Sequence, residues 1–171
     1  KDLELNALNY ETELMPEDYY INGPIQADIW IESSANEAVI SVRIDEVSPD
    51  GNTVLPLTNG LLAATSRAVD IERSRYLDGQ MIQPYHYFTE DSASAVTPGE
   101  IIKMQVEIFP TSAIIRKGHR LRVSISPSNQ AQGVMNYVQQ DNAINGVTTI
   151  HNSPEHLSSV VLPIVPISEL N

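Results

Sequence analysis

The side chains that could do chemistry are few, and their spacing fits no common catalytic pattern. The four histidines are His86, His119, His151 and His156. His151 and His156 flank Glu155, so the three side chains could form a metal site or an acid–base pair. Their spacing matches no usual zinc-ligand pattern, however, and the intervening Pro154 favours a turn. We therefore predict a structural turn at this point and no metal ligand.

Oxygen ligands of the kind that calcium prefers gather near the end of one apolar segment. Asp45, Glu46, Asp50 and Asn52 offer carboxylate and amide oxygens. The alternative is a solvated strand end followed by an Asx turn, because Pro49-Asp50-Gly51-Asn52 is a strong turn sequence. We favour the turn, and we predict neither a metal nor another cofactor.

The sequence lacks the signatures of a self-sufficient enzyme. It contains no cysteine, which excludes disulfides, thiolate catalysis, zinc–cysteine sites and iron–sulfur clusters. Its 8 glycines form no Gly-x-Ser-x-Gly elbow, phosphate loop or dinucleotide fingerprint. We therefore expect no catalytic residue in this chain.

Charge and hydropathy limit the partners of the chain. Its 22 acidic and 10 basic residues give a net charge of -12, which argues against nucleic acid and against anionic membrane surfaces. No apolar run approaches the ~20 residues that span a bilayer. The first residue is Lys1 rather than Met, so we expect a piece of a longer protein. The compartment stays undecided between cytoplasmic and secreted.

The elements that must position these residues are β-strands, because apolar and polar residues alternate with a period of two. The clearest strands are 27–32, 40–45, 104–109 and 120–125. Weaker candidates are 3–8, 54–57, 61–67, 147–151 and 159–163. One short helix is predicted near 133–140.

Turn signals separate the predicted strands. Besides residues 49–52, they are Asn22-Gly23-Pro24, Asn59-Gly60, Pro98-Gly99, Lys117-Gly118 and Asn145-Gly146. About eight or nine short antiparallel strands predict an all-β jelly-roll sandwich. We expect residues 1–171 to form one such domain.

Two long loops and one tryptophan stand out from this framework. Residues 126–146 are rich in Asn and Gln, and residues 70–98 contain four consecutive ring-bearing residues. These four are Tyr85, His86, Tyr87 and Phe88. Trp30 alternates with Ile29 and Ile31, so it faces away from the core if they face into it. It marks either an interface or a binding platform, or it is covered by a loop of this domain.

Three residues at the start of strand 120–125 suggest a structural motif. Gly118 suits a turn, and the ring of His119 is expected to anchor that turn through hydrogen bonds. Arg120 and Arg122 share the outer face of their strand. They are either solvated or ion-paired within the domain, or they form a salt bridge to another domain.

Several segments together resemble the C-terminal domain of the X-Pro dipeptidyl-peptidase family, which includes the cocaine esterase and α-amino acid ester hydrolase group. The matching segments are 22–24, 27–34, 44–51, 58–63, 98–100, 109–113, 118–122, 154–156 and 162–166. They run in order and cover nearly the whole chain. Asn36-Glu37-Ala38-Val39 departs from the paired aspartates that many members carry there. Residues 84–89 look more like one branch of bacterial acyl esterases.

This resemblance implies a galactose-binding-like jelly roll attached to an α/β-hydrolase domain of the same chain. In such enzymes a Ser-His-Asp triad of the hydrolase domain performs acyl transfer. The jelly roll would then be a non-catalytic accessory domain that stabilises the hydrolase and walls part of its cleft. The interface candidates are Trp30, Tyr85, His86, Tyr87 and Phe88.

Two other functions remain open. The fold class also hosts carbohydrate-binding modules, and exposed tyrosines could serve as sugar platforms. Alternatively, the domain could serve oligomerisation, with Trp30 and the long loops contacting a second copy of the chain.

Overall fold

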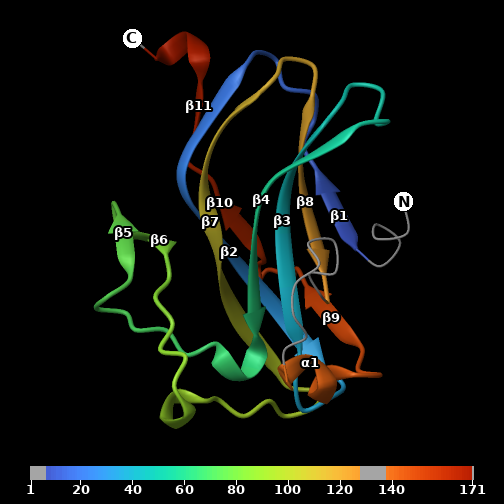
Figure 1. Ribbon diagram of the computed structural model, residues 1–171, viewed down its shortest axis with the longest axis vertical. Coiled ribbons are helices and arrows are strands. Elements are labelled where there is room, and N and C mark those ends of the chain that lie inside the picture. The colour runs from blue at the N-terminus through green and yellow to red at the C-terminus, as the bar shows by residue number, and fades with distance from the viewer. Residues whose placement is uncertain (1–6, 128–137, 171) are drawn as a thin grey trace.

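The computed structural model describes residues 7–127 and 138–170, which form two antiparallel β-sheets packed face to face (Figure 1). The predicted β-sandwich is therefore confirmed. The described residues contain eleven strands, compared with the eight or nine predicted. No helix in the described residues has the length and apolar character needed to cross a membrane.

The first sheet has four strands. In spatial order they are β1 (Leu8–Glu11), β8 (Arg120–Ser126), β3 (Val39–Val47) and β4 (Val54–Ala63), and each pairs antiparallel with its neighbour. Residues that are paired across the strands point to the same face of the sheet. Val42 of β3 therefore lies between Gly60 of β4 and Ile125 of β8 on the face that meets the core. The opposite face carries polar residues such as Arg43 and Ser124.

The second sheet has five strands, built around one long central strand. This strand is β2 (Tyr19–Ser33), and the others all pair with it: β7 (Ile101–Ile115), β9 (Thr148–His151), β10 (Ser159–Val161) and β11 (Ile164–Pro166). β7 covers one edge of β2, and the three short strands divide the other edge between them.

The core lies between the two sheets and consists of aliphatic side chains. In β2 the inward residues Ile25, Ala27, Ile29 and Ile31 are almost fully buried, as the period-two pattern predicts. Their neighbours on β7 and β3 complete one continuous cluster. Because this burial removes apolar surface from water, it is the main force that holds the sheets together.

One pair of sheet edges approaches unusually closely. A Cβ atom placed on Gly60 of β4 would lie 1.9 Å from the carbonyl oxygen of Glu107 on β7. Next to it, the Thr58 hydroxyl donates a hydrogen bond of 2.6 Å to the carbonyl of Phe109. Gly60 was predicted to form a turn with Asn59, and this prediction is wrong: both lie inside β4, where glycine permits close backbone contact.

A second predicted turn is also part of a strand. Asn22-Gly23-Pro24 lies within β2, where the register with β7 shifts between Gly23 and Ile25. Proline cannot donate to the sheet and Gly23 has φ 135°, so the signal marks a bulge rather than a chain reversal. The turns predicted at 98–99, 117–118 and 145–146 do lie between elements, with positive φ at Gly99, Gly118 and Asn145.

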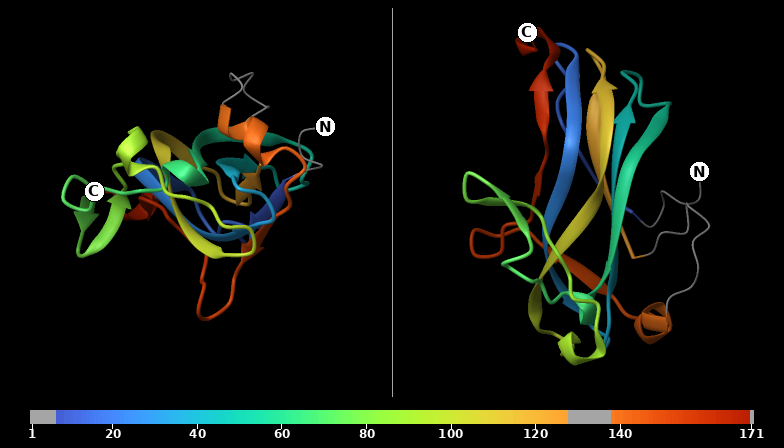
Figure 2. Two further views of the ribbon diagram at one scale, coloured as in Figure 1. Left: turned by 90° about the horizontal axis from the view of Figure 1, so that it is seen from below. Right: turned by 60° about the vertical axis from the view of Figure 1, so that its left-hand side comes forward.

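The long segment after β4 folds over the outer face of the five-stranded sheet. It begins with a 3₁₀ turn at Ala64–Ser66 and contains the hairpin of β5 (Arg75–Leu77) and β6 (Gln80–Gln83). The Gln83 amide donates to the Glu107 carboxylate of β7 at 2.6 Å, which ties the hairpin to the sheet. In the right-hand view of Figure 2, the hairpin and the 152–158 loop project on the same side.

The remaining elements are short. Residues Glu90–Ser92 and Ile167–Glu169 form 3₁₀ turns, and α1 spans Val138–Ala143. The helix predicted near 133–140 thus overlaps α1 at 138–140, and its other residues lie outside the described part. Most of the predicted strand 3–8 also lies outside it, and β1 begins at residue 8. The predicted strand 61–67 ends early, because the 3₁₀ turn follows β4 directly.

Candidate functional site

Trp30 lies on the outer face of the five-stranded sheet, as its alternation with Ile29 and Ile31 predicts. It is partly covered by the 152–158 loop. The imidazole of His156 meets the indole edge-on with ring centroids 4.8 Å apart, and the Trp30 backbone amide donates to the Ser158 hydroxyl at 3.0 Å. Trp30 is half-buried, so it is neither a core residue nor a free platform.

The segment between the last two histidines is a turn, as predicted. The backbone amides of Ser153 and His156 each donate to the other residue's carbonyl, at 3.3 and 3.1 Å. The imidazole of His151 lies 3.2 Å from the Glu32 carboxylate and 6.2 Å, centroid to centroid, from the ring of His156. No group of three or more His, Cys, Asp or Glu in the described residues is placed to hold a metal ion.

Tyr85 is held in a fixed position on the hairpin segment. Its backbone amide donates to the Ser74 hydroxyl at 2.9 Å, and its carbonyl accepts from the Asp70 amide at 2.8 Å. The guanidinium of Arg73 stacks on one face of its ring, 3.7 Å from the centroid. One face of this tyrosine is therefore occupied, although 40% of the side chain is exposed.

His86 turns inward, unlike its neighbours in the aromatic run. It is only 5% exposed and forms an isolated β-bridge with Val69. Burial lowers the pKa of His86 below its usual value, against the opposing effects of the Glu107 charge and a hydrogen bond to the Gln105 backbone. A neutral His86 thus anchors the segment on β7, and its ring is not available at the surface.

Phe88 is the most exposed ring of this segment, at 68%. Its backbone adopts φ 50°, a left-handed conformation that is strained for a bulky side chain. Directly after it, Thr89 and Ser92 form a reciprocal capping box at the Glu90–Ser92 turn. Phe88 also borders a hollow of about 500 Å³ beside the end of β4.

The residues at 118–120 form an internal structural motif. Gly118 adopts φ 77° and its amide donates to the Met15 carbonyl at 2.9 Å. His119 Nδ1 lies 2.9 Å from the Glu46 carboxylate. The Arg120 guanidinium is 3.9 Å from Glu11. This contact is an ion pair within the domain, one of the alternatives considered for the two arginines.

The four residues considered as calcium ligands do not converge. Asp45 is fully buried, and its carboxylate accepts two hydrogen bonds from the Arg43 guanidinium, at 2.6 and 3.0 Å. Glu46 accepts the Arg116 amide at 2.9 Å on the other face of β3. Asp50 accepts the Asn52 amide at 3.1 Å in an Asx turn. The turn that the sequence favoured is therefore present.

One structural carboxylate escaped the sequence analysis. Glu37 is 1% exposed and accepts three hydrogen bonds: from the Ala38 amide at 2.9 Å, and from the Thr65 amide and hydroxyl at 3.1 and 2.5 Å. It ties the start of β3 to the 3₁₀ turn after β4. The only available signal was the departure from paired aspartates at 36–39, which marked the position but not the partner.

A β-sandwich with internally anchored histidines and an exposed aromatic segment has the features of an accessory or binding domain. The comparisons with known proteins agree. Residues 2–161 match the family described as the X-Pro dipeptidyl-peptidase C-terminal non-catalytic domain. The chain belongs to this family.

Relatives of the chain are hydrolases. The cocaine esterase of Rhodococcus sp. (strain MB1 Bresler) is 27% identical over 168 residues, which cover 94% of this chain and 26% of the esterase. Among solved structures, a CocE/NonD family hydrolase from Staphylococcus aureus superposes with a TM-score of 0.77 at 18% identity, over 95% of this chain and 31% of that one. An aminopeptidase from the marine sediment archaeon Thaumarchaeota archaeon gives a TM-score of 0.66 at 17% identity, over 94% and 26%.

These structural likenesses show a shared fold. The chain spans 26% and 25% of the length of the curated relatives it matches. Those relatives are accordingly much longer proteins, in which the region similar to this chain is one part.

Proposed function

We propose that this domain packs against an α/β-hydrolase catalytic domain of the same polypeptide and forms part of the wall of its substrate cleft. The exposed aromatic run at 85–88 carries the proposal. Three of its four side chains face solvent, yet hydrogen bonds hold the backbone at Tyr85, and Phe88 adopts a strained conformation. Clefts commonly lie between domains, so this position suits a cleft wall.

Apolar exposure is concentrated on the segment that carries these rings. Six large apolar side chains between residues 71 and 88 are at least 40% exposed: Ile71, Tyr76, Leu77, Tyr85, Tyr87 and Phe88. Clustered exposed apolar residues of this kind mark protein interfaces, where aromatic side chains are enriched. Trp30, on the outer face of the same sheet, extends the proposed contact.

The strain at Phe88 supports an interface role independently. A left-handed backbone at a non-glycine residue costs about 1–2 kcal/mol, and such residues cluster at functional sites. In this domain the side chain gains little burial in return, since most of it is in water. A catalytic domain that covers Phe88 would supply the missing burial.

The parent protein is proposed to be a serine hydrolase that acts on ester or peptide bonds through an acyl-enzyme. Its triad would lie in the catalytic domain, because this chain offers no nucleophile elbow. The histidines of this chain have structural contacts instead of a triad role: His86 is buried, His119 pairs with Glu46, and His151 pairs with Glu32. The isolated chain is therefore expected to show no hydrolase activity.

Sugar binding is the weaker alternative. A sugar platform needs an open aromatic face, and one of the two faces of Tyr85 is occupied by Arg73. Trp30 is likewise met edge-on by His156. A glycan screen with the isolated chain tests this alternative, and sedimentation tests the oligomerisation alternative.

The decisive experiment uses Phe88→Gly in two settings. In the isolated chain, glycine relieves the positive φ and removes an exposed ring, so stability should stay equal or rise by about 1 kcal/mol. In the natural polypeptide that carries this chain, the same change should lower the unfolding temperature and the kcat/KM for a short-chain ester. Leu55→Ala, at a side chain that is 51% exposed on β4, serves as the matched control.

The comparison between the two settings separates the outcomes. A loss of stability in the isolated chain would show that Phe88 serves the fold of this domain. No effect in either setting would show that Phe88 is not at an interface. An equal effect of Leu55→Ala in the long polypeptide would show that the contact is not localised on the aromatic run.

A further inference from the structure

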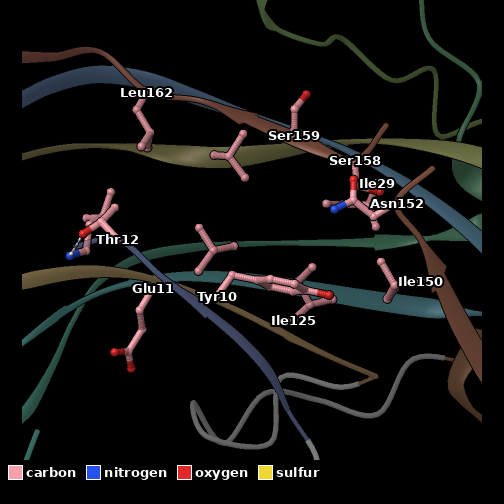
Figure 3. A pocket seen from close by; sticks show the side chains of 13 residues that line it. Tyr10, Glu11, Thr12, Ile29, Ile125, Ile150, Asn152, Ser158, Ser159 and Leu162 are labelled. Carbon is pink, nitrogen blue, oxygen red and sulfur yellow. Dashed lines mark hydrogen bonds between the residues drawn. The ribbon is translucent and has the colours of Figure 1, made fainter. Parts of the chain in front are cut away.

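A cavity of about 320 Å³ opens between the two sheets, along the edge where β1 faces β9 and β10 (Figure 3). It lies on the side of the sandwich opposite the contact of Gly60 with β7. There the backbones touch, whereas here the short β1 stands apart from the short strands of the other sheet. The cavity therefore follows from the way the two sheets splay apart.

The inner lining of this cavity is aliphatic and comes from both sheets. It consists of Ile29, Leu121, Val123, Ile125, Ile150, Val160 and Leu162. Glu11 is the charged residue of the lining, but its carboxylate points away from the other side chains in Figure 3 and binds Arg122 at 2.6 Å. An occupant of the interior would thus meet apolar surface and no free charge.

Two polar groups at the opening have unused hydrogen-bonding capacity. The ring of Tyr10 lies along the cavity with its hydroxyl toward the end where Ile150 and Asn152 lie (Figure 3). Within the described residues, neither this hydroxyl nor the Asn152 amide has a hydrogen-bond partner. The nearby Ser158 hydroxyl differs, because it donates to the His151 carbonyl at 2.7 Å and accepts from Trp30.

We propose that this cavity binds a small neutral molecule with an apolar body of about two fused rings and one hydrogen-bonding group at its end. A cavity of ~150 Å³ holds benzene, and small-molecule pockets begin near ~300 Å³, so a volume of about 320 Å³ fits a body of naphthalene size. The polar end would reach Tyr10 and Asn152. The net charge of -12 disfavours an anionic ligand.

This proposal does not rest on the proposed role beside a catalytic domain. The cavity opens between the β1 edge and β9–β10, whereas the aromatic run lies on the segment that follows β4. The domain would therefore hold its ligand in its own core, whether or not a catalytic domain is docked.

The test is a titration of the 171-residue chain with 2-naphthol, followed by methyl NMR spectroscopy. Saturable shifts are expected at the methyl groups of Ile29, Ile125 and Val160, with a dissociation constant on the order of 0.1 mM. The methyl groups of Leu77, exposed on β5, should not move. No saturable shift up to millimolar naphthol, or shifts centred elsewhere, would overturn the proposal.

Variants separate occupation of the interior from contact at the opening. Val160→Trp fills the cavity and should weaken binding at least tenfold. Asn152→Ala, at an exposed side chain, should weaken it about three- to tenfold without changing the unfolding temperature. Asn22→Ala, an exposed position on β2 away from the cavity, should change nothing. Unchanged affinity in both Val160→Trp and Asn152→Ala would refute the assignment.

Two further measurements identify what occupies the cavity. 2-Naphthoate should bind at least tenfold more weakly than 2-naphthol, and equal affinity would contradict the preference for a neutral ligand. Shifts of the same methyl groups on raising the protein concentration without naphthol would show that a second copy fills the cavity, which would also overturn the proposal.

Discussion

Gly60→Ala should destabilise this domain strongly, although the same substitution in most strands is harmless or helpful. The φ angle of Gly60 is not in the left-handed region, so alanine can adopt its backbone conformation. By itself the change would stabilise the fold by about 0.4–1 kcal/mol, because it restricts the unfolded chain. The expected loss of stability therefore comes wholly from the contact between β4 and β7.

The magnitude follows from the geometry at that contact. The new Cβ would lie 1.9 Å from the Glu107 carbonyl oxygen and 2.8 Å from its carbon, whereas ordinary contacts begin at 3.4 Å. Both atoms belong to the backbone, so the strands must separate by about 1.5 Å. Overpacking of this kind costs about 1–3 kcal/mol, and loss of the adjacent Thr58–Phe109 hydrogen bond adds about 0.5–1.5 kcal/mol.

Urea and thermal unfolding of the isolated chain measure this loss. We expect a net decrease of about 1–4 kcal/mol in the free energy of unfolding, which corresponds to roughly 3–12 °C for a domain of this size. Gly51→Ala is the matched control: Gly51 has φ 72° but nothing within 4 Å of the new Cβ, so it reports backbone strain alone. If Gly60→Ala costs less than Gly51→Ala, or less than about 1 kcal/mol, the close-contact explanation is wrong.

Three further predictions concern buried polar groups. Arg43→Met should cost about 3–5 kcal/mol in urea unfolding, because among the described residues it leaves the fully buried Asp45 carboxylate with the Ser124 hydroxyl at 3.0 Å as its one remaining side-chain partner. A loss below about 1 kcal/mol would show that water replaces the guanidinium. Glu37→Gln should cost about 1–3 kcal/mol by weakening the link to Thr65, and an unchanged urea midpoint would refute this role. The folded-state pKa of His86 is lowered, so its contribution to stability is present above about pH 6.5 and is lost as the pH falls through the lower folded value. The free energy of unfolding of the wild type should therefore decrease between pH 7.5 and pH 5.5. The decrease for His86→Gln over the same range should be smaller. Asp50 cannot produce this difference, because its pKa is about 2.

The strands of the sandwich could be predicted because their alternation reflects burial on one face. β3 and β7 contain the predicted segments 40–45 and 104–109, and in each the apolar half of the pattern is buried. The pattern is a local property of the chain, since neighbouring side chains point to opposite faces. Strand ends were less predictable, because they depend on partners elsewhere, such as the three short strands that divide one edge of β2.

Glycine and proline gave signals of two different kinds. Where the chain reverses, as at Gly99 and Gly118, positive φ is a local requirement that the turn sequence reveals. At Gly60 the requirement is the approach of a strand that is distant in sequence, and at Gly23 it is a bulge against the same strand, β7. The same residue types therefore meant a turn in some places and close packing or a bulge in others.

The interface candidates divide along the same line between local and distant causes. Local alternation was enough to place Trp30 on the outer face of its sheet. Its cover comes from the 152–158 loop, where the His156 ring meets the indole and Ser158, 128 residues away, accepts the Trp30 amide; no local pattern could predict these contacts. The run at 85–88 shows the same limit. Its composition marked four ring-bearing residues, but it did not show that His86 is the one buried beside Glu107 and Gln105 of β7. An inward His86 between exposed tyrosines fixes the segment to β7, and that fixed backbone is what allows Tyr85, Tyr87 and Phe88 to present a preformed apolar surface.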